Sequence, residues 1–202
     1  MPSAEFFTRL GLLNVRDFFD AELCSKLLAE ARSATATPAT VGSEGGNYVV
    51  DENLRRTKTA EVSAATTSLV KTRLLALQPA LEKHYNVPIT DCQEPQFLVY
   101  REGDFFEAHR DSRRDSDAAE FSKERKVSAV IFLNGEDEVP GPDVYGGGSL
   151  TFYGLMGDPR LKGHGLPLTG EPGLLVTFRP ELVHEVTPVT HGERYTIVSW
   201  FQ

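Results

Sequence analysis

The sequence predicts an α+β protein in which a β-sandwich or jelly roll carries helices on the outer face of its larger sheet. From residue 95 onward, short segments rich in β-branched and aromatic residues are separated by Gly, Pro, Asn or Asp, which is typical of closely spaced strands. Before residue 95, apolar residues recur at helical spacing. With 202 residues, 40% of them hydrophobic and 25% charged, the chain has the size and composition of one globular domain.

Two amphipathic helical patterns occupy the first half of the chain. Asp20 is a suitable N-cap for a helix over residues 21–33. Its apolar stripe consists of Leu23, Leu27, Leu28 and Ala31. The second stripe consists of Leu69 or Val70, Leu74, Leu77 and Leu81. Pro79 is expected to kink or restart this second helix, and we expect both stripes to pack on the sheet.

Residues 35–63 are rich in Thr, Gly, Ser and charged side chains, which predicts a long loop with a short hairpin around "NYVV". The short basic run "NLRRTK", residues 53–58, lies in this loop. Such runs are usually solvated surface, and contact with a substrate is the alternative.

The second half contains the predicted strands, at residues 95–100, 104–111, 126–134, 148–154, 173–180, 182–189 and 194–201. Nothing in the composition marks a second domain. We therefore expect one domain over residues 1–202, with helical support and loops in 1–94 and the jelly-roll core and active site in 95–202.

Charge and hydropathy exclude several classes of function. The net charge of −8 argues against a nucleic-acid partner, because backbone binding relies on clustered Lys and Arg. No segment approaches the roughly 20 apolar residues of a membrane span. The first residues do not form a secretory signal, so we expect a cytoplasmic protein in which Cys24 and Cys92 are buried free thiols.

His109 and Asp111 are two residues apart in a predicted strand. Side chains at i and i+2 project from the same face of a strand, about 7 Å apart, so both can reach one metal ion. An exposed strand end is the alternative. His184 lies in a later apolar run, where it is either a hydrogen-bonded core histidine or the third member of a metal site. Two histidines and one carboxylate form the facial triad of non-heme Fe(II) oxygenases.

Arg194 begins the most apolar predicted strand at the C-terminal end. A buried guanidinium requires an anionic partner. Glu193 or Glu185 would provide a structural ion pair. The alternative is a bound carboxylate ligand held in a bidentate fork, with support from the hydroxyl of Thr196, which shares the strand face at i+2.

The segments "YREGDFFEAHRD", "RKVSAVIFLN", "YGGGSLTFYG" and "HEVTPVTHGERYTIVSWF" together resemble the prolyl 4-hydroxylase superfamily of Fe(II)- and 2-oxoglutarate-dependent dioxygenases. The resemblance is strongest to the branch of oxygen-sensing prolyl hydroxylases and their bacterial relatives, and it covers roughly residues 95–202. The helical segment "NVRDFFDAELCSKLLAEA" also fits this family. The fold implied by the resemblance is a double-stranded β-helix, the jelly roll of these enzymes.

The resemblance implies roles for individual residues. By position, the iron ligands would be His109, Asp111 and His184. Arg194 would pair with the distal carboxylate of 2-oxoglutarate, supported by Thr196. Tyr100 would hydrogen-bond a carboxylate oxygen near the other end of the cosubstrate; a core aromatic with a wet hydroxyl is the alternative for this residue.

Two features depart from the family pattern. Phe132 stands where the oxygen-sensing relatives tend to carry a tyrosine that also bonds the distal carboxylate. The hydrogen bond of that tyrosine is therefore missing, or Thr196 or another group supplies it. The charged run of residues 112–126 is longer than the usual connection. It is expected to be a solvated loop, with a short helix or a lid as the alternative.

The implied reaction uses Fe(II), 2-oxoglutarate and O2 to hydroxylate an unactivated C–H bond, and releases succinate and CO2. Ascorbate is expected to help keep the iron reduced. The resemblance favours a prolyl residue in a protein or peptide as substrate, with residues 38–58 and 112–126 as candidate walls of the cleft. A free amino acid or other small metabolite is one alternative, and a jelly-roll metal-binding protein that is not an oxygenase is another.

Overall fold

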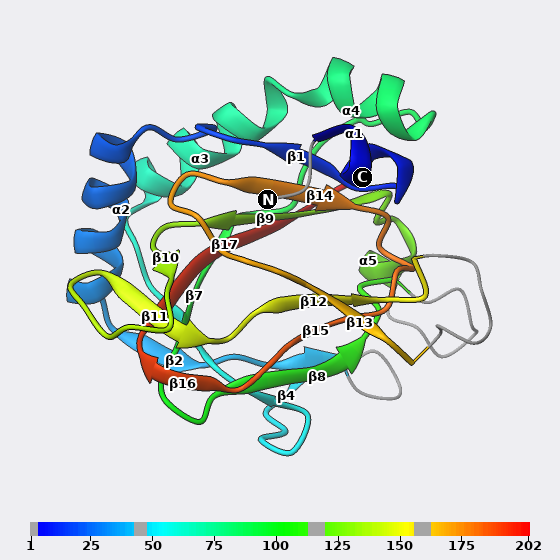
Figure 1. Ribbon diagram of the computed structural model, residues 1–202. Helices are drawn as coiled ribbons and strands as arrows, with labels where there is room; N and C mark the ends of the chain where they lie inside the picture. Colours follow the sequence, from blue (N-terminus) through cyan, green and yellow to red (C-terminus); the bar gives the residue numbers. More distant parts are fainter. Residues whose placement is uncertain (1–3, 43–47, 113–119, 156–162) are drawn as a thin grey trace.

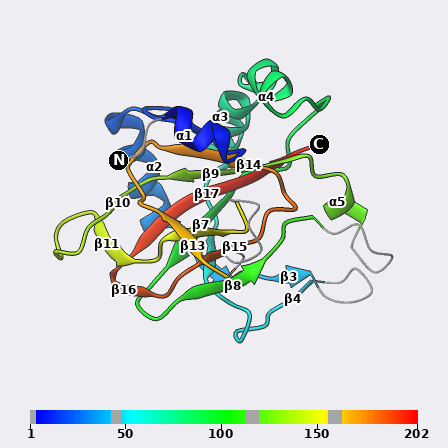
Figure 2. The ribbon, with the colours of Figure 1, turned by 45° about the vertical axis from the view of Figure 1, so that its right-hand side comes forward.

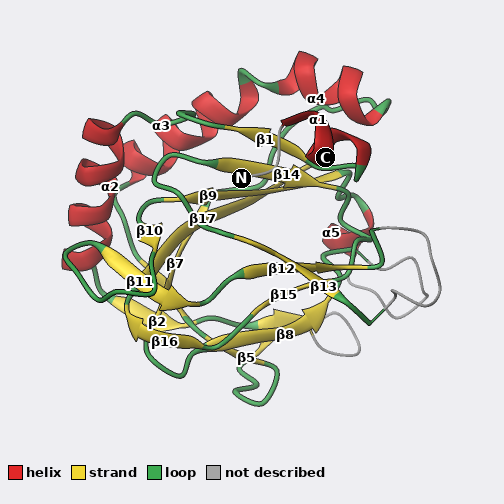
Figure 3. Cartoon of the chain, in the orientation of Figure 1, coloured by secondary structure: helices red, strands yellow, loops and turns green. Residues whose placement is uncertain are grey.

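Two β-sheets face each other in the computed structural model, which describes residues 4–42, 48–112, 120–155 and 163–202 (Figures 1 and 3). The larger sheet contains, in spatial order, β1 (Leu13–Val15), β14 (Leu175–Phe178), β9 (Val127–Phe132), β17 (Arg194–Phe201), β7 (Gln96–Tyr100), β6 (Lys58–Ala60) and β2 (Ala36–Pro38). The smaller sheet contains β13 (Gly165–Leu168), β12 (Leu150–Tyr153), β15 (His184–Val186), β8 (Phe105–His109) and β5 (Arg55–Arg56).

Two further groups of short strands lie outside these two sheets. One small sheet consists of β10 (Gly135–Glu136), β11 (Val144–Gly147) and β16 (Val189–Gly192). A second pair consists of β3 (Val41–Gly42) and β4 (Tyr48–Val49). Each of the predicted strand segments contains a strand, and the arrangement agrees with the predicted jelly roll.

Helices cover the outer face of the larger sheet, as predicted (Figure 2). They are α2 (Ala21–Ser33), α3 (Ala64–Leu75) and α4 (Gln78–Tyr85), with the shorter α1 (Ala4–Arg9) near β1. Their buried side chains in the shared core are Cys24, Leu27, Leu28, Ala31, Val70, Leu74, Leu81 and Tyr85. None of the helices that the structure describes is long and apolar enough to cross a membrane.

The helix boundaries follow from local chemistry. The carboxylate of Asp20 accepts a hydrogen bond from the Leu23 backbone N–H at 2.8 Å, which caps α2 as predicted. Pro79 lies in the first turn of α4, so the helical pattern restarts there, because proline lacks the N–H that an uninterrupted helix would need. Both cysteines, Cys24 and Cys92, are buried and free, as predicted.

The N-terminal half contributes more sheet than the sequence indicated. Residues 35–63, predicted to be loop with one hairpin, form strands that complete both sheets. The chain crosses from β5 in the smaller sheet to β6 in the larger one at Thr57, whose hydroxyl donates to the Val99 carbonyl at 2.8 Å. Strands of two or three residues show no alternating pattern, so only their pairing with β8 and β7 reveals them.

The side chains of β17 point alternately into the core beneath the helices and into the interior of the sandwich. Tyr195 and Ile197 belong to the apolar cluster beneath the helices. Arg194, Thr196 and Val198 line a pocket between the two sheets. Because successive side chains of a strand point to opposite faces, the same strand supports the core and supplies polar groups to the pocket.

The charged run of residues 112–126 is only partly covered by the described residues. Residues 113–119 lie outside them. The run ends in a one-turn helix, α5 (Glu120–Lys123), so the predicted loop contains the short helix that was its alternative.

Leu74→Ala is expected to lower the free energy of unfolding by about 2–5 kcal/mol, because Leu74 is fully buried between α3 and the sheet. Leu69→Ala on the same helix is the matched control. With 41% of Leu69 exposed, its loss is expected to change the stability by no more than about 0.5 kcal/mol. Urea unfolding followed by tryptophan fluorescence measures both. Equal costs would contradict the helix register.

Candidate functional site

His109 and His184 lie directly opposite each other on neighbouring strands. His109 ends β8 and His184 begins β15, and the antiparallel register pairs the two residues. Directly paired residues share a sheet face, and here the ring centroids are 4.3 Å apart. Two histidines that are 75 residues apart in sequence are thus brought together by one strand pairing.

Backbone carbonyls set the orientation of both imidazoles. Nδ1 of His109 lies 2.7 Å from the Glu107 carbonyl, and Nδ1 of His184 lies 2.9 Å from the Leu182 carbonyl. A carbonyl can only accept, so each Nδ1 carries the proton and donates it. In the neutral imidazole, Nε2 is then the nitrogen with the free lone pair that a metal ligand requires.

Asp111 completes a group that we call the His-Asp-His cluster, consisting of His109, Asp111 and His184. The sequence placed Asp111 inside a strand, but β8 ends at His109, and the Asp111 backbone N–H instead donates to the Pro180 carbonyl at 2.8 Å. The carboxylate lies 3.6 Å from Nε2 of each histidine. One ligand atom from each residue lies within 4.8 Å of the other two.

Ser128 orients the carboxylate of this cluster. Its hydroxyl, on β9 in the larger sheet, donates to Oδ2 of Asp111 at 2.6 Å. Nearby, Arg125 donates to the Asp111 backbone carbonyl at 3.0 Å and stacks its guanidinium on Trp200 at 3.7 Å. The sequence analysis did not single out Ser128, because only the facing of the two sheets brings it to Asp111.

Electrostatics keep the cluster in the protonation state that binds a cation. Burial alone would raise the pKa of Asp111, but attraction to His184, His109 and Arg125 outweighs it and lowers that pKa well below its usual range. Burial, with repulsion from His109, lowers the pKa of His184 to about 4 despite the attraction of Asp111. Near neutral pH, the carboxylate is charged and His184 is neutral.

The donor set fits Fe(II). Two imidazole nitrogens and one carboxylate oxygen lie within reach of one ion, which is the donor set that leaves adjacent coordination positions open on non-heme iron. Aromatic rings enclose the imidazoles: Phe106 stacks on His109 at 3.6 Å, and Phe178 contacts His184 edge-on at 4.6 Å. These aromatic rings restrict the imidazoles of His109 and His184 to this geometry.

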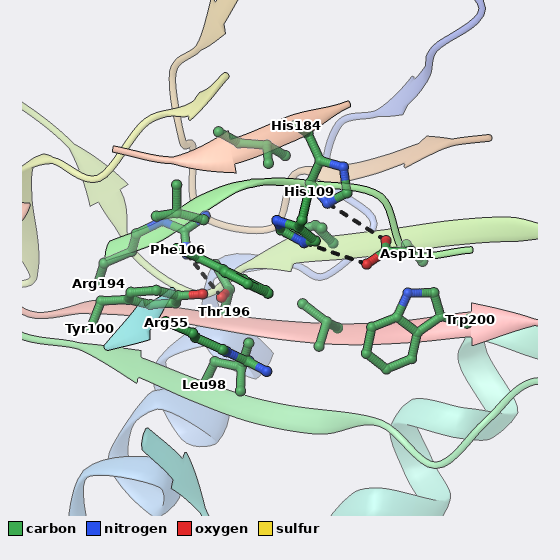
Figure 4. A pocket seen from close by; sticks show the side chains of 15 residues that line it. Arg55, Leu98, Tyr100, Phe106, His109, Asp111, His184, Arg194, Thr196 and Trp200 are labelled. Atoms are coloured by element: carbon green, nitrogen blue, oxygen red, sulfur yellow. Dashed lines mark hydrogen bonds and ion pairs between the residues drawn. The ribbon is translucent and has the colours of Figure 1, made fainter. Parts of the chain in front are cut away.

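Arg194 lies in the same pocket as the cluster, and only 1% of it is exposed (Figure 4). Neither predicted structural partner pairs with it: Glu193 binds Arg101 at 3.0 Å, and Glu185 accepts from the Tyr153 hydroxyl at 2.5 Å. The guanidinium donates to the Thr196 hydroxyl at 3.2 Å, and its Nε has no partner among the described residues. A buried cation is thus left without an anion.

Three aromatic residues surround this guanidinium. The ring centroids of Tyr100, Phe132 and Tyr145 lie 5.0, 5.1 and 6.0 Å from the Arg194 Cζ. Tyr100 lines the pocket, as predicted. Phe132 is fully buried and offers no hydroxyl, but the buried hydroxyl of Tyr145 has no partner among the described residues.

Close packing at Gly170 holds the Tyr145 hydroxyl in place. A Cβ on Gly170 would lie 2.1 Å from that hydroxyl oxygen and 2.6 Å from the Phe132 ring, so no larger residue fits here. Tyr145 carries no signal in the sequence that would mark it as a neighbour of Arg194. A fully buried tyrosine is visible only in the structure.

Arg55 is the second guanidinium in the pocket lining. The basic run of residues 53–58 was predicted to be solvated surface, with substrate contact as the alternative. The prediction of solvated surface is wrong for Arg55, which is only 8% exposed, and holds for its exposed neighbour Arg56. The cause is the pairing of β5 with β8, which sends alternate side chains inward.

The predicted site residues therefore gather in one pocket between the sheets, lined by Tyr100, His109, Asp111, His184, Arg194 and Thr196. Figure 4 shows the His-Asp-His cluster between Arg194 and Tyr100 on one side and Trp200 on the other. The pocket thus offers a metal-binding cluster at its centre and an unpaired cation at one end.

Comparison with known sequences places this pocket in a family context. Residues 95–202 match the 2OG-Fe(II) oxygenase superfamily. A PKHD-type hydroxylase from Rhizorhabdus wittichii is 32% identical over 109 residues, which is 54% of this chain and 42% of the relative. The match thus covers less than half the length of that relative.

Solved structures share the fold over nearly the whole chain. A prolyl-4-hydroxylase from Pseudomonas putida superimposes with a TM-score of 0.69 at 24% identity, covering 98% of this chain and 96% of the other. A Trichoplax adhaerens prolyl hydroxylase, solved with a peptide fragment of the hypoxia inducible factor oxygen degradation domain, gives 0.66 at 18% identity and covers 98% and 86%. These likenesses confirm the predicted jelly roll. Because the family match spans more than half of the chain and includes the whole His-Asp-His cluster, this protein belongs to the 2OG-Fe(II) oxygenase superfamily.

Proposed function

We propose that this protein is an Fe(II)- and 2-oxoglutarate-dependent dioxygenase that hydroxylates an unactivated C–H bond of a prolyl residue in a protein or peptide. One observation carries this proposal: a buried guanidinium that has no anionic partner in the described part of the chain shares a pocket with a cluster of potential metal ligands. A metal-binding jelly roll that is not an oxygenase has no use for such a cation. A dicarboxylate bound next to the metal would neutralise it.

In this proposal His109, Asp111 and His184 hold Fe(II). The hydrogen bonds at each Nδ1 keep both Nε2 lone pairs directed at the metal, and Ser128 occupies one carboxylate oxygen so that the other faces it. Together, Fe(II), 2-oxoglutarate and O2 supply the oxidising power for hydroxylation, with succinate and CO2 as co-products. The protein residues orient these groups and exclude water.

Arg194 binds the distal carboxylate of 2-oxoglutarate in this scheme. Its guanidinium presents several donors, and Thr196 offers a hydroxyl beside it. The Thr196 hydroxyl, which lines the pocket, then supplies the hydrogen bond that Phe132 cannot make. Tyr100 lines the same pocket, and Figure 4 shows its hydroxyl directed toward Thr196. Each donor is buried, so each bond forms in a medium where it is strong.

The prolyl substrate is supported by likeness alone. Both the Pseudomonas putida and Trichoplax adhaerens structures are of prolyl hydroxylases. A free amino acid or small metabolite is the second candidate, since the pocket lining contains an additional cation, Arg55, that could bind its carboxylate. Ascorbate dependence and a cytoplasmic location stay predictions.

We also propose a single domain over residues 1–202, because β1, β2, β5 and β6 complete sheets formed by the second half.

Release of succinate tests the proposed function. Purified protein with Fe(II) and 2-oxoglutarate is expected to form succinate faster when a substrate is present, because binding of the substrate couples decarboxylation to hydroxylation. A panel of proline-containing peptides and free amino acids identifies the class. If neither succinate nor a hydroxylated product forms with any member, and the protein binds no 2-oxoglutarate, the assignment is wrong.

Arg194→Ala is expected to weaken 2-oxoglutarate binding by roughly 100-fold or more, because at least two charge-assisted hydrogen bonds are lost. Iron affinity should stay nearly unchanged. Anaerobic calorimetry measures both quantities. Arg101→Ala is the matched control, since Arg101 is exposed and paired with Glu193 outside the pocket. Equal cosubstrate affinity in wild type and Arg194→Ala would dismiss the role of Arg194.

Ser128→Ala is expected to reduce iron affinity by roughly 10–100-fold, because the Asp111 carboxylate loses the hydrogen bond that sets its orientation. Ser128→Thr keeps a hydroxyl and should restore most of the affinity. Ser199→Ala is the control, as its buried hydroxyl donates to Gln93 at 2.7 Å and lies outside the pocket lining. An unchanged iron content in both Ser128→Ala and Asp111→Ala would indicate a purely structural cluster.

A further inference from the structure

Arg55 is a buried cation that the roles assigned above do not use. It lies on β5, at the point where the chain passes from the smaller sheet to the larger one, and its side chain forms part of the pocket wall. Only 8% of the residue is exposed. Within the described residues, no carboxylate pairs with it.

The contacts of Arg55 leave donors available. One terminal nitrogen donates to the Thr40 carbonyl at 3.0 Å, whereas the buried Nε has no partner among the described residues. The guanidinium lies over the Phe106 ring with its Cζ 4.7 Å from the centroid. Phe106 in turn stacks on His109 at 3.6 Å, so one aromatic ring separates Arg55 from a metal-binding imidazole.

The charges of the pocket indicate what Arg55 binds. In the proposed function, the two positive charges of Fe(II) and that of Arg194 face the single charge of Asp111 and the double charge of 2-oxoglutarate. These groups balance, and Arg55 is left as a buried charge that no carboxylate of the described residues compensates. Such a charge is costly in a low-dielectric interior unless an anion comes to it. The cosubstrate is already neutralised, so this anion belongs to the primary substrate.

We propose that Arg55, whose guanidinium lies over the Phe106 ring, binds a carboxylate of the primary substrate in the pocket that it lines together with the His-Asp-His cluster. This inference rests on the proposed function and narrows its substrate class to molecules with an acidic group near the reacting carbon. The carboxylate comes either from the α-carboxyl group of a free amino acid or from an acidic side chain beside the target residue of a peptide.

Arg55 and Arg194 are held by different strand pairs, which separates their ligands. In the backbone register, Arg194 of β17 lies opposite Tyr100 of β7 in the larger sheet. Arg55 of β5 lies opposite Phe106 of β8 in the smaller sheet. Figure 4 shows Arg55 between Phe106 and Leu98, with Arg194 beside Tyr100. Two anionic groups can therefore be bound at once, one by each guanidinium.

Matched ligand pairs that differ in a single charge test this inference. The first pair is L-proline and L-prolinamide. The second is a capped prolyl peptide with either Asp or Asn next to the proline. Binding of each ligand to protein loaded with Fe(II) and 2-oxoglutarate is measured by anaerobic calorimetry, so that the result does not depend on turnover. The pair that shows a preference identifies the source of the carboxylate.

Wild-type protein is expected to bind the acid of at least one pair about 10-fold or more tightly than its amide, the value of one charge-assisted hydrogen bond. In Arg55→Met, which keeps an unbranched apolar side chain without the guanidinium, the preference should fall to within about 2-fold. Arg55→Lys retains the charge and should keep part of the preference. Arg56→Met is the matched control, because Arg56 lies on the same strand over Phe105 but is exposed and outside the pocket lining.

Thermal unfolding of each variant shows whether it is folded, and the Arg55→Lys result supports the inference independently of Arg55→Met. The inference is overturned if no wild-type acid binds more tightly than its amide, or if the preference survives in Arg55→Met. It is also overturned if Arg55→Met weakens 2-oxoglutarate binding instead, since Arg55 would then serve the cosubstrate. If wild-type protein binds neither Fe(II) nor 2-oxoglutarate, the proposed function itself fails.

Discussion

The pairing of β8 with β15 is the interaction on which the site depends. Its register places His109 opposite His184, and the carbonyls of Glu107 and Leu182 then turn both Nε2 atoms in the same direction. A shift by one residue would send one imidazole to the other face of the sheet. The aromatic rings around the histidines and the tie between Asp111 and Pro180 reinforce this register, so the metal-binding geometry is built into the strand pairing.

The two buried guanidiniums determine which ligands the pocket favours. In the described part of the chain, Arg194 and Arg55 each have an unpartnered Nε and no acidic partner. Aromatic faces and single carbonyl or hydroxyl contacts only partly offset the loss of hydration. The fold therefore carries an electrostatic strain that anionic ligands relieve, and this strain favours charged ligands over neutral ones of the same shape.

The N-terminal half shapes the pocket as well as covering the sheet. Its helices bury the outer face of the larger sheet, which frees the inner face of β17 for Arg194 and Thr196. Its short strands β5 and β6 connect the two sheets and bring Arg55 inward. The same half of the chain thus supports the sheet and lines the pocket, although its sequence indicated only helices and a loop with a short hairpin.

The sequence by itself predicted seven strand segments of the second half and the two helical stripes, because periodicity and caps are local signals, whereas β10, β11 and β13 lie outside the predicted segments. A spaced His-x-Asp, His and Arg pattern, together with the family resemblance, indicated the residues of the His-Asp-His cluster and Arg194. Tertiary structure alone decided which partners these residues meet. Ser128 reaches Asp111 and Tyr145 reaches Arg194 only because separate strands face each other across the sandwich. Arg55 was predicted to lie on the surface but forms part of the pocket wall, and the reason is the same. The direction of a side chain on a two-residue strand depends on the strand that pairs with it.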